Sequence, residues 1–234
     1  MELSTSTQHP ALAIFPLLTD KEFDSACDQF LGRVHVANES LMGRLTFQYA
    51  QRAIGPILRI TRRISHVSIP AYNSQSSADD PIRERYTEAY EDDPEALIRT
   101  PEPSVSLHVV YDVLLSPTYQ VPVLYFNLRP TDHPGPLGID AVYQYLVPSQ
   151  YREELQSVGV MGGISLGYHP ESGTPAFFVH PCNTADVMRQ IAGHRRVTPE
   201  TYLIIWLGLV GNRLGLQLPR DFFATDELRG NSRS

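Results

Sequence analysis

The residues with the clearest chemical potential lie at 177–184, which read Phe-Phe-Val-His-Pro-Cys-Asn-Thr. Cys182 lies between an apolar run typical of a strand and residues typical of a helix start. Unpaired amides at a helix start stabilise an anion, so this position suits a thiolate nucleophile. Pro181 favours an extended His180, which places the imidazole on the same face as the thiol. The motif alone is also compatible with other roles: Cys182 could be an inert, packed thiol rather than a nucleophile, and His180 could be a structural hydrogen-bonding residue rather than a base.

Other kinds of catalytic site have less support. The glycines at 162, 163 and 167 match neither the dinucleotide fingerprint nor the Walker loop, so an activated substrate would have to come from another protein. The eight histidines are scattered without ligand spacing, and no metal site is expected. A cysteine hydrolase would need a separately held histidine such as His169 or His194, and no feature of the sequence places either one.

Composition narrows the class of protein. The 234 residues include 19 Lys and Arg and 26 Asp and Glu, a net charge of −7 that argues against binding nucleic acid or a membrane surface. Two cysteines, Cys27 and Cys182, exclude a disulfide framework and a four-thiolate zinc site. The apolar runs are too short for a membrane span, and residues 11–18 make a poor signal peptide, so we expect a cytoplasmic protein.

Acidic charge is concentrated in residues 68–104. Nine acidic residues and three arginines give this segment a net charge of −6, and it also holds five prolines. Such a composition buries too little apolar surface to offset the entropy of ordering. We therefore expect a solvated, flexible insertion within a single domain that covers residues 1–234. The alternative is an acidic docking arm for a basic partner.

Hydrophobic periodicity predicts helices packed on a sheet. A helix capped by Asp20 places Cys27 on its apolar face, as a packed thiol. Strands are expected at 45–49, 58–64, 105–115, 121–128, 164–168 and 176–179, in a sheet with one wet face. Further helices are expected at 138–157 with a break at Pro148, from residue 183 or 184, and after a cap at Thr198, the last of these being buried. This order predicts an α+β fold in which an amino-terminal and two carboxy-terminal helices pack on an antiparallel sheet.

The segment around Cys182 resembles the active-site segment of the autophagy-type ubiquitin-like conjugating enzymes, where His-Pro-Cys precedes a polar residue and Thr. Residues 119–126, His169-Pro170 and residues 202–219 extend this resemblance. With the amino-terminal helix, these segments cover most of the chain outside 68–104. The resemblance implies a ubiquitin-conjugating-type fold, which agrees with the predicted order of elements.

The resemblance also implies a reaction and its partners. Cys182 would accept the terminal glycine of a ubiquitin-like modifier, autophagy-related protein 12, from the activating enzyme autophagy-related protein 7. It would then pass the acyl group to a lysine of the target, autophagy-related protein 5, and ATP would be spent upstream, so no cofactor is expected. A partner sheet would pair with a free strand edge in residues 45–64 or in the hairpin 105–128. The alternatives are the family branch that modifies a phospholipid amine, and a non-catalytic scaffold with the same fold.

One departure concerns the oxyanion of the transfer step. Ordinary ubiquitin-conjugating enzymes carry His-Pro-Asn before the cysteine, but here Glu171 follows His169-Pro170, and a carboxylate cannot stabilise an oxyanion. The candidates to replace that Asn are His180, Asn183 through its side chain or its backbone amide, and Tyr119, which matches a tyrosine near the catalytic cysteine of the family. Tyr119 is equally compatible with a turn aromatic that packs on the sheet.

Overall fold

The computed structural model describes residues 11–36, 45–67, 105–131, 135–157, 163–193 and 196–218. The acidic segment 68–104 and His194 therefore lie outside the described residues. The strands are β1 (Leu45–Arg52), β2 (Gly55–Val67), β3 (Val105–Leu115), β4 (Pro122–Pro130), β5 (Ile164–Tyr168) and β6 (Pro175–Val179). The α-helices are α1 (Asp20–Val36), α3 (Ile139–Tyr145), α4 (Ser149–Ser157), α5 (Thr184–Ala192) and α6 (Pro199–Val210). In the part of the chain so described, no helix combines the length and the apolar character that crossing a membrane requires.

The strands form one antiparallel sheet in the order β1-β2-β3-β4-β6-β5. After β4 the chain leaves the sheet through α3 and α4, returns at the far edge as β5, and then inserts β6 between β5 and β4. Tyr125 pairs with Phe178 and Phe126 with Phe177, which places the end of β6 beside the start of β4. The predicted antiparallel α+β arrangement is confirmed. Of the two alternatives for a free strand edge, the first is confirmed, because β1 within residues 45–64 is an edge of the sheet. The hairpin 105–128 is not an edge, because β3 and β4 are each paired on both sides, and the other edge is β5.

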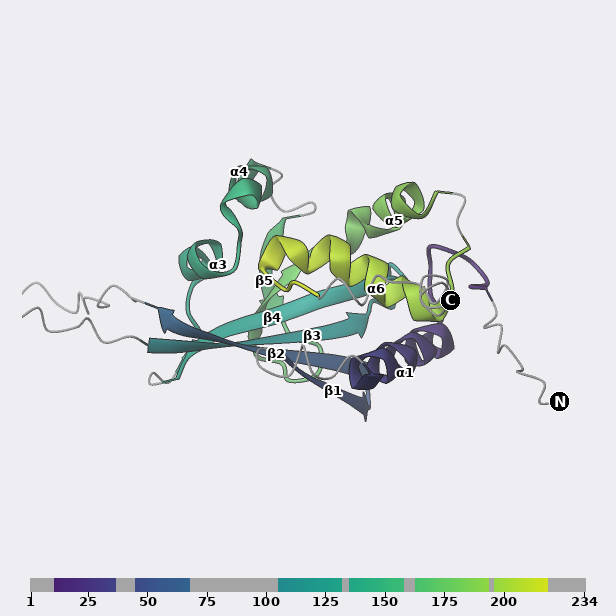
Figure 1. Cartoon of the computed structure of the whole chain (residues 1–234), viewed down its shortest axis with the longest axis horizontal. Coiled ribbons are helices and arrows are strands. Elements are labelled where there is room, and N and C mark those ends of the chain that lie inside the picture. Colours follow the sequence, from purple (N-terminus) through teal and green to yellow (C-terminus); the bar gives the residue numbers. More distant parts are fainter. Residues whose placement is uncertain are drawn as a thin grey trace, which may run out of the picture.

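Helix α6 is the apolar element that covers the sheet, and Figure 1 shows it running along one face, with α1 beside one of its ends. Thr198 and Thr201 form a reciprocal capping box, and Pro199 occupies the first helical position. The buried side chains of the helix are those of Pro199, Tyr202, Leu203, Ile204, Trp206, Leu207 and Val210. The prediction of a buried last helix, capped at Thr198, is confirmed.

Helix α1 packs against α6 and against strands β1 and β2. The Arg33 Nε donates to Oε1 of Glu200 over 2.7 Å, which ties the two helices together. The predicted cap at Asp20 is wrong by one residue. The Thr19 hydroxyl accepts from the Glu22 amide, and the Glu22 carboxylate accepts from the Thr19 amide, so Thr19 is the cap.

The two faces of the sheet differ in what covers them. On the helix-covered face, the β3 side chains of Leu107, Val109, Tyr111 and Val113 are completely buried. On the other face, Ile57, Leu114 and Val123 are buried as well, at 3–5% exposure. The expectation of one wet face is therefore wrong at the centre of the sheet. The reason is that the turn after β5 folds back over this face, where His169 lies against Asp112.

Replacing Tyr202 by Phe tests the anchoring of α6. The Tyr202 hydroxyl donates to the buried carbonyl of Pro16 over 2.8 Å, and burial raises the pKa of this phenol. We expect Tyr202→Phe to lower the free energy of unfolding by about 1–2 kcal/mol, because the carbonyl loses its partner. Urea denaturation measures the change, and Tyr168→Phe, at a side chain 75% exposed, is the control. Equal stability of the two variants would contradict the anchoring role.

Candidate active site

Cys182 lies at the junction between a strand and a helix, as the sequence predicts. Strand β6 ends at Val179, a short 3₁₀ turn covers Pro181–Asn183, and α5 begins at Thr184. The Cys182 side chain is partly exposed, whereas Cys27 is completely buried. Burial raises the pKa of the Cys27 thiol, and the nearby carboxylates of Asp24 and Asp28 act in the same direction. Cys27 is therefore the packed thiol, and Cys182 is the one that a substrate can reach.

The imidazole of His180 is fixed by the backbone of the cysteine itself. The Cys182 amide donates to Nδ1 of His180 over 3.2 Å. Because Nδ1 accepts, the neutral ring carries its proton on Nε2, which is left to donate. The Cys182 amide is already used in this contact, so it is not the group that receives a developing oxyanion.

Tyr119 reaches the same site from the turn between β3 and β4. Its ring lies edge-on to His180, with centroids 5.7 Å apart and planes at 77°. Tyr119 is 40% exposed, and its ring contacts the imidazole at the end of β6, so a role at the site and a packing role both stay open. Pairing of β4 with β6 explains the contact, because it sets the turn before β4 beside the residues after β6.

The turn that carries Tyr119 is held from two sides. The Gln120 amide donates to the Ser116 carbonyl over 2.8 Å, and the Tyr119 amide donates to Oγ of Ser116 over 3.2 Å. Gln120 adopts a positive φ of 52°, and its carbonyl accepts from the Leu18 amide over 2.8 Å. The segment before α1 therefore contributes to the position of Tyr119.

Asn183 precedes α5 and is exposed. Its side chain makes no capping hydrogen bond to the helix. The amide nitrogen of this side chain is thus available to donate to a substrate beside Cys182.

His169 lies away from Cys182, at the other end of β6. The Glu171 and Ser172 amides approach its Nδ1 at 3.3 and 3.4 Å, and its Nε2 lies 3.3 Å from Oδ2 of Asp112. A five-residue strand separates this turn from Cys182, and the His169 side chain is buried. The structure therefore does not recruit His169 for a cysteine hydrolase.

Asp112 is the centre of a polar cluster beneath that turn. Its two oxygens accept from Nε and Nη2 of Arg59, each over 2.7 Å. Burial acts to raise the pKa of Asp112, but Arg59 and His169 outweigh it and hold the pKa below its usual range. Glu171 pairs with Arg52 over 3.0 Å, so it lies with this cluster rather than at the cysteine. The sequence does not predict this cluster. Apolar and polar residues alternate along 105–115, and that pattern assigns Asp112 to the face of the sheet that was expected to be exposed to water.

Among the residues that the structure describes, no three His, Cys, Asp or Glu side chains are grouped so that they would hold a metal ion. What the site offers is a reachable thiol, an oriented imidazole, a phenol and an amide. That set suits acyl transfer through a covalent thioester.

Residues 22–221 match the family described as "Autophagocytosis associated protein, active-site domain". The chain belongs to this family. The match includes Cys182 and both carboxy-terminal helices, and it confirms the family resemblance of the sequence.

Several proteins with sequences similar to this chain carry the name "Ubiquitin-like-conjugating enzyme ATG10". One from Gibberella zeae is 43% identical over 57% of this chain and 56% of its own length. One from Homo sapiens is 32% identical over 54% of this chain and 57% of its own length. A structure titled "Crystal structure of Autophagic E2, Atg10" covers 86% of this chain and 99% of its own, with a TM-score of 0.47 and 14% identity. The chain thus spans a little over half the length of the curated relatives that it matches, and within the family the resemblance is to autophagy-related protein 10.

Replacing Asp112 by Asn tests the polar cluster under the His169 turn. We expect a loss of about 2 kcal/mol in the free energy of unfolding, less than the roughly 3–5 kcal/mol of a fully buried pair, because the Arg59 side chain is 40% exposed. The folded-state pKa of Asp112 is lowered, so this stability is present above the unfolded pKa of about 3.9 and is lost as pH falls through the folded value.

Urea unfolding of wild type and Asp112→Asn between neutral and acid pH measures that difference. Asp186→Asn is the control, because it breaks an exposed ion pair with Arg189 worth at most about 1 kcal/mol. A stability difference that stays constant into acid pH would contradict the role of the Asp112 charge.

Proposed function

We propose that this chain is a ubiquitin-like conjugating enzyme of autophagy that carries a modifier as a thioester on Cys182. The modifier is autophagy-related protein 12, the donor is the activating enzyme autophagy-related protein 7, and the acceptor is a lysine of autophagy-related protein 5. The observation that carries the proposal is the reachable Cys182 thiol at a strand–helix junction, with His180 held against its amide. Family membership supports it, and so do the printed names of the relatives.

Two acyl transfers make up the proposed reaction. In the first, the Cys182 thiolate attacks the carbonyl carbon of the modifier's terminal glycine, and the bond from that carbon to the activating enzyme's cysteine breaks. In the second, a lysine amine attacks the same carbon, the bond to Sγ of Cys182 breaks, and the amine loses a proton as the isopeptide forms. The energy comes from ATP spent upstream, so neither transfer requires a nucleotide or metal on this chain.

Each transfer passes through a tetrahedral oxyanion that needs a hydrogen-bond donor. Glu171 pairs with Arg52 and cannot donate. The groups that can donate are Nε2 of His180, the Asn183 side chain and the Tyr119 hydroxyl. His180 and Tyr119 contact one another, so they act as one unit in which the phenol helps to hold the imidazole.

The first test follows the adduct on a non-reducing gel, with activating enzyme, modifier and ATP. Wild type is expected to form a thiol-sensitive adduct, and Cys182→Ser a thiol-resistant ester, because an oxygen ester withstands thiols. Cys27→Ala is the matched control and should keep the thiol-sensitive adduct. No adduct on any variant, with the activating enzyme demonstrably charged, would leave a non-catalytic scaffold. Offering the modifier of the lipid-modifying branch in parallel distinguishes that branch, and charging by that modifier alone would contradict the proposed substrate.

The second test separates the two transfers. We expect both Tyr119→Phe and His180→Ala to slow discharge of the Cys182 thioester to the target lysine. The variant that removes the oxyanion donor should slow this step by about 10²–10³. Thioester formation should change less, because it exchanges one thioester for another through a thiolate, whereas discharge requires attack by a lysine amine that is mostly protonated at neutral pH. Single-turnover charging and discharge are measured separately, with Asn183→Ala in the same series and Tyr168→Phe and His35→Ala as exposed controls. Equal loss of both steps would assign these residues to the fold.

A further inference from the structure

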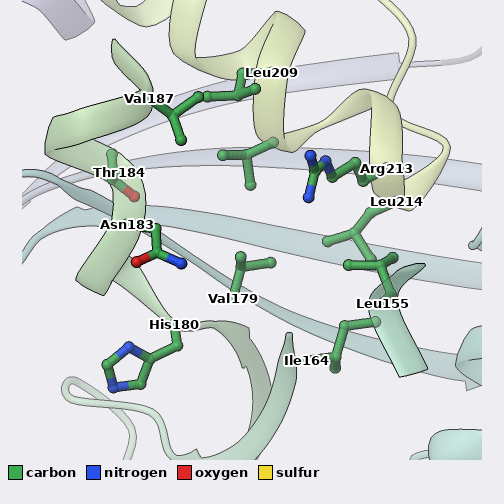
Figure 2. A pocket seen from close by; sticks show the side chains of 11 residues that line it. Leu155, Ile164, Val179, His180, Asn183, Thr184, Val187, Leu209, Arg213 and Leu214 are labelled. Atoms are coloured by element: carbon green, nitrogen blue, oxygen red, sulfur yellow. The ribbon is translucent and has the colours of Figure 1, made fainter. Parts of the chain in front are cut away.

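An apolar cavity of about 240 Å³ opens beside the turn that carries Cys182. Figure 2 shows its lining side chains, with His180 and Asn183 along one wall. The apolar part of the lining comes from elements far apart in the chain: Leu155 of α4, Ile164 of β5, Val179 of β6, Val187 of α5, Leu209 and Val210 of α6, and Leu214 of the turn after it. Arg213 of the same turn also lines the cavity, so one wall carries a charged side chain (Figure 2). The cavity is partly open to solvent and mostly apolar, which is the kind of concave surface that takes up a ligand group.

The size of the cavity limits what it can hold. At about 240 Å³ it is smaller than the roughly 300–1,000 Å³ clefts that take drug-sized ligands. It exceeds the ~150 Å³ apolar cavity that accepts a benzene molecule. The volume and the aliphatic lining therefore fit one bulky apolar side chain, aromatic or branched, rather than a nucleotide or another cofactor.

The position of the cavity indicates where that side chain comes from. His180 and Asn183, which flank Cys182 on either side, both line the cavity, so its wall is the cysteine's own turn. A peptide attached through its terminal carboxyl to Sγ of Cys182 leaves this turn at about 3.3 Å per residue. Its penultimate residue, or the one before it, is thus the part of the acyl donor within reach of the cavity.

Polar groups at the mouth suit the backbone of such a peptide. Asn183 lines the cavity just before α5 and is exposed, whereas Thr184 next to it is buried, and the Asn183 side chain makes no capping bond to the helix. An amide at this position can pair with a peptide group of an extended chain, while the aliphatic interior takes the side chain.

We infer that this cavity is the subsite for a bulky apolar side chain, one or two residues before the terminal glycine of the modifier, an inference that rests on the proposed function of Cys182. The subsite selects which acyl donor is accepted, because a small residue leaves the aliphatic part of the lining unfilled.

Short peptide thioesters test this without the activating enzyme. N-acetyl tetrapeptides that end in Gly as a thioester of mercaptoethanesulfonate differ only in the residue before Gly, or in the one preceding it. In the reaction, the Cys182 thiolate bonds to the glycyl carbon, and mercaptoethanesulfonate leaves and takes up the proton. Intact-protein mass spectrometry follows acylation of the full chain. We expect a Leu, Phe or Trp peptide to react at least about tenfold faster than its Ala counterpart at one of the two positions.

Variants of the lining connect this preference to the cavity. Val187→Phe fills the space and is expected to bring the ratio of bulky to Ala peptide close to one. Gln190→Phe, at an exposed position of the same helix outside the lining, is the matched control and should keep the ratio. Leu209→Ala enlarges the space and should shift the preference toward the largest side chain, which keeps the test decisive if Val187→Phe does not fold.

Two outcomes would overturn the inference. Equal acylation by every peptide at both positions would remove the subsite and leave the proposed conjugating activity standing. Absence of acylation by any thioester, together with a blank modifier-charging gel, would instead remove the proposed function itself.

Discussion

Burial of the apolar helix α6 against the sheet is the constraint on which the other contacts of this protein depend. The helix is apolar on nearly all sides, so it must be covered by the sheet on one side and by other helices elsewhere. Helix α1 meets that need and is held by the ion pair between Arg33 and Glu200. The hydroxyl of Tyr202 then fixes the segment before α1 by its bond to the Pro16 carbonyl. The hydrophobic core is thus also the element that locates the amino-terminal segment.

Backbone hydrogen bonds connect this packing of α6 and the amino-terminal segment to the site around Cys182. The amino-terminal segment bonds to the turn of Tyr119 at Leu18 and Gln120, and the phenol ring contacts His180. From the other direction, β6 delivers His180 and Cys182 at its end, beside the start of β4. The imidazole is therefore held both by the Cys182 amide and by a phenol on a separate element. Such double support is what an acyl-transfer site needs, because its donors must be in place before charge develops.

The two ends of β6 have different tasks. At one end, His169, Asp112 and Arg59 form a buried polar cluster that fastens the turn between β5 and β6 to the sheet. At the other end, the same strand leads into the partly exposed thiol and the adjoining cavity. The pair His169-Pro170, in the turn between β5 and β6, is therefore structural in this chain. In the reaction that we propose, oxyanion stabilisation falls to groups near Cys182 itself, and the cavity beside that residue selects the acyl donor.

The sequence by itself determined the features that depend on neighbouring residues. These are the turn at Cys182, the buried last helix with its cap at Thr198, the break at Pro148 and the packed position of Cys27. Each follows from local stereochemistry or from periodicity, which a linear pattern records. Even the cap of α1 was displaced by one residue, from Asp20 to Thr19, because several polar residues there compete for the same amides. Tertiary structure alone decided that β6 inserts between β4 and β5, that Tyr119 meets His180, that Asp112 is buried, and that helices and strands far apart in the chain enclose a cavity. Those outcomes depend on strand order and on packing between residues far apart in the chain, and no local pattern carries that information.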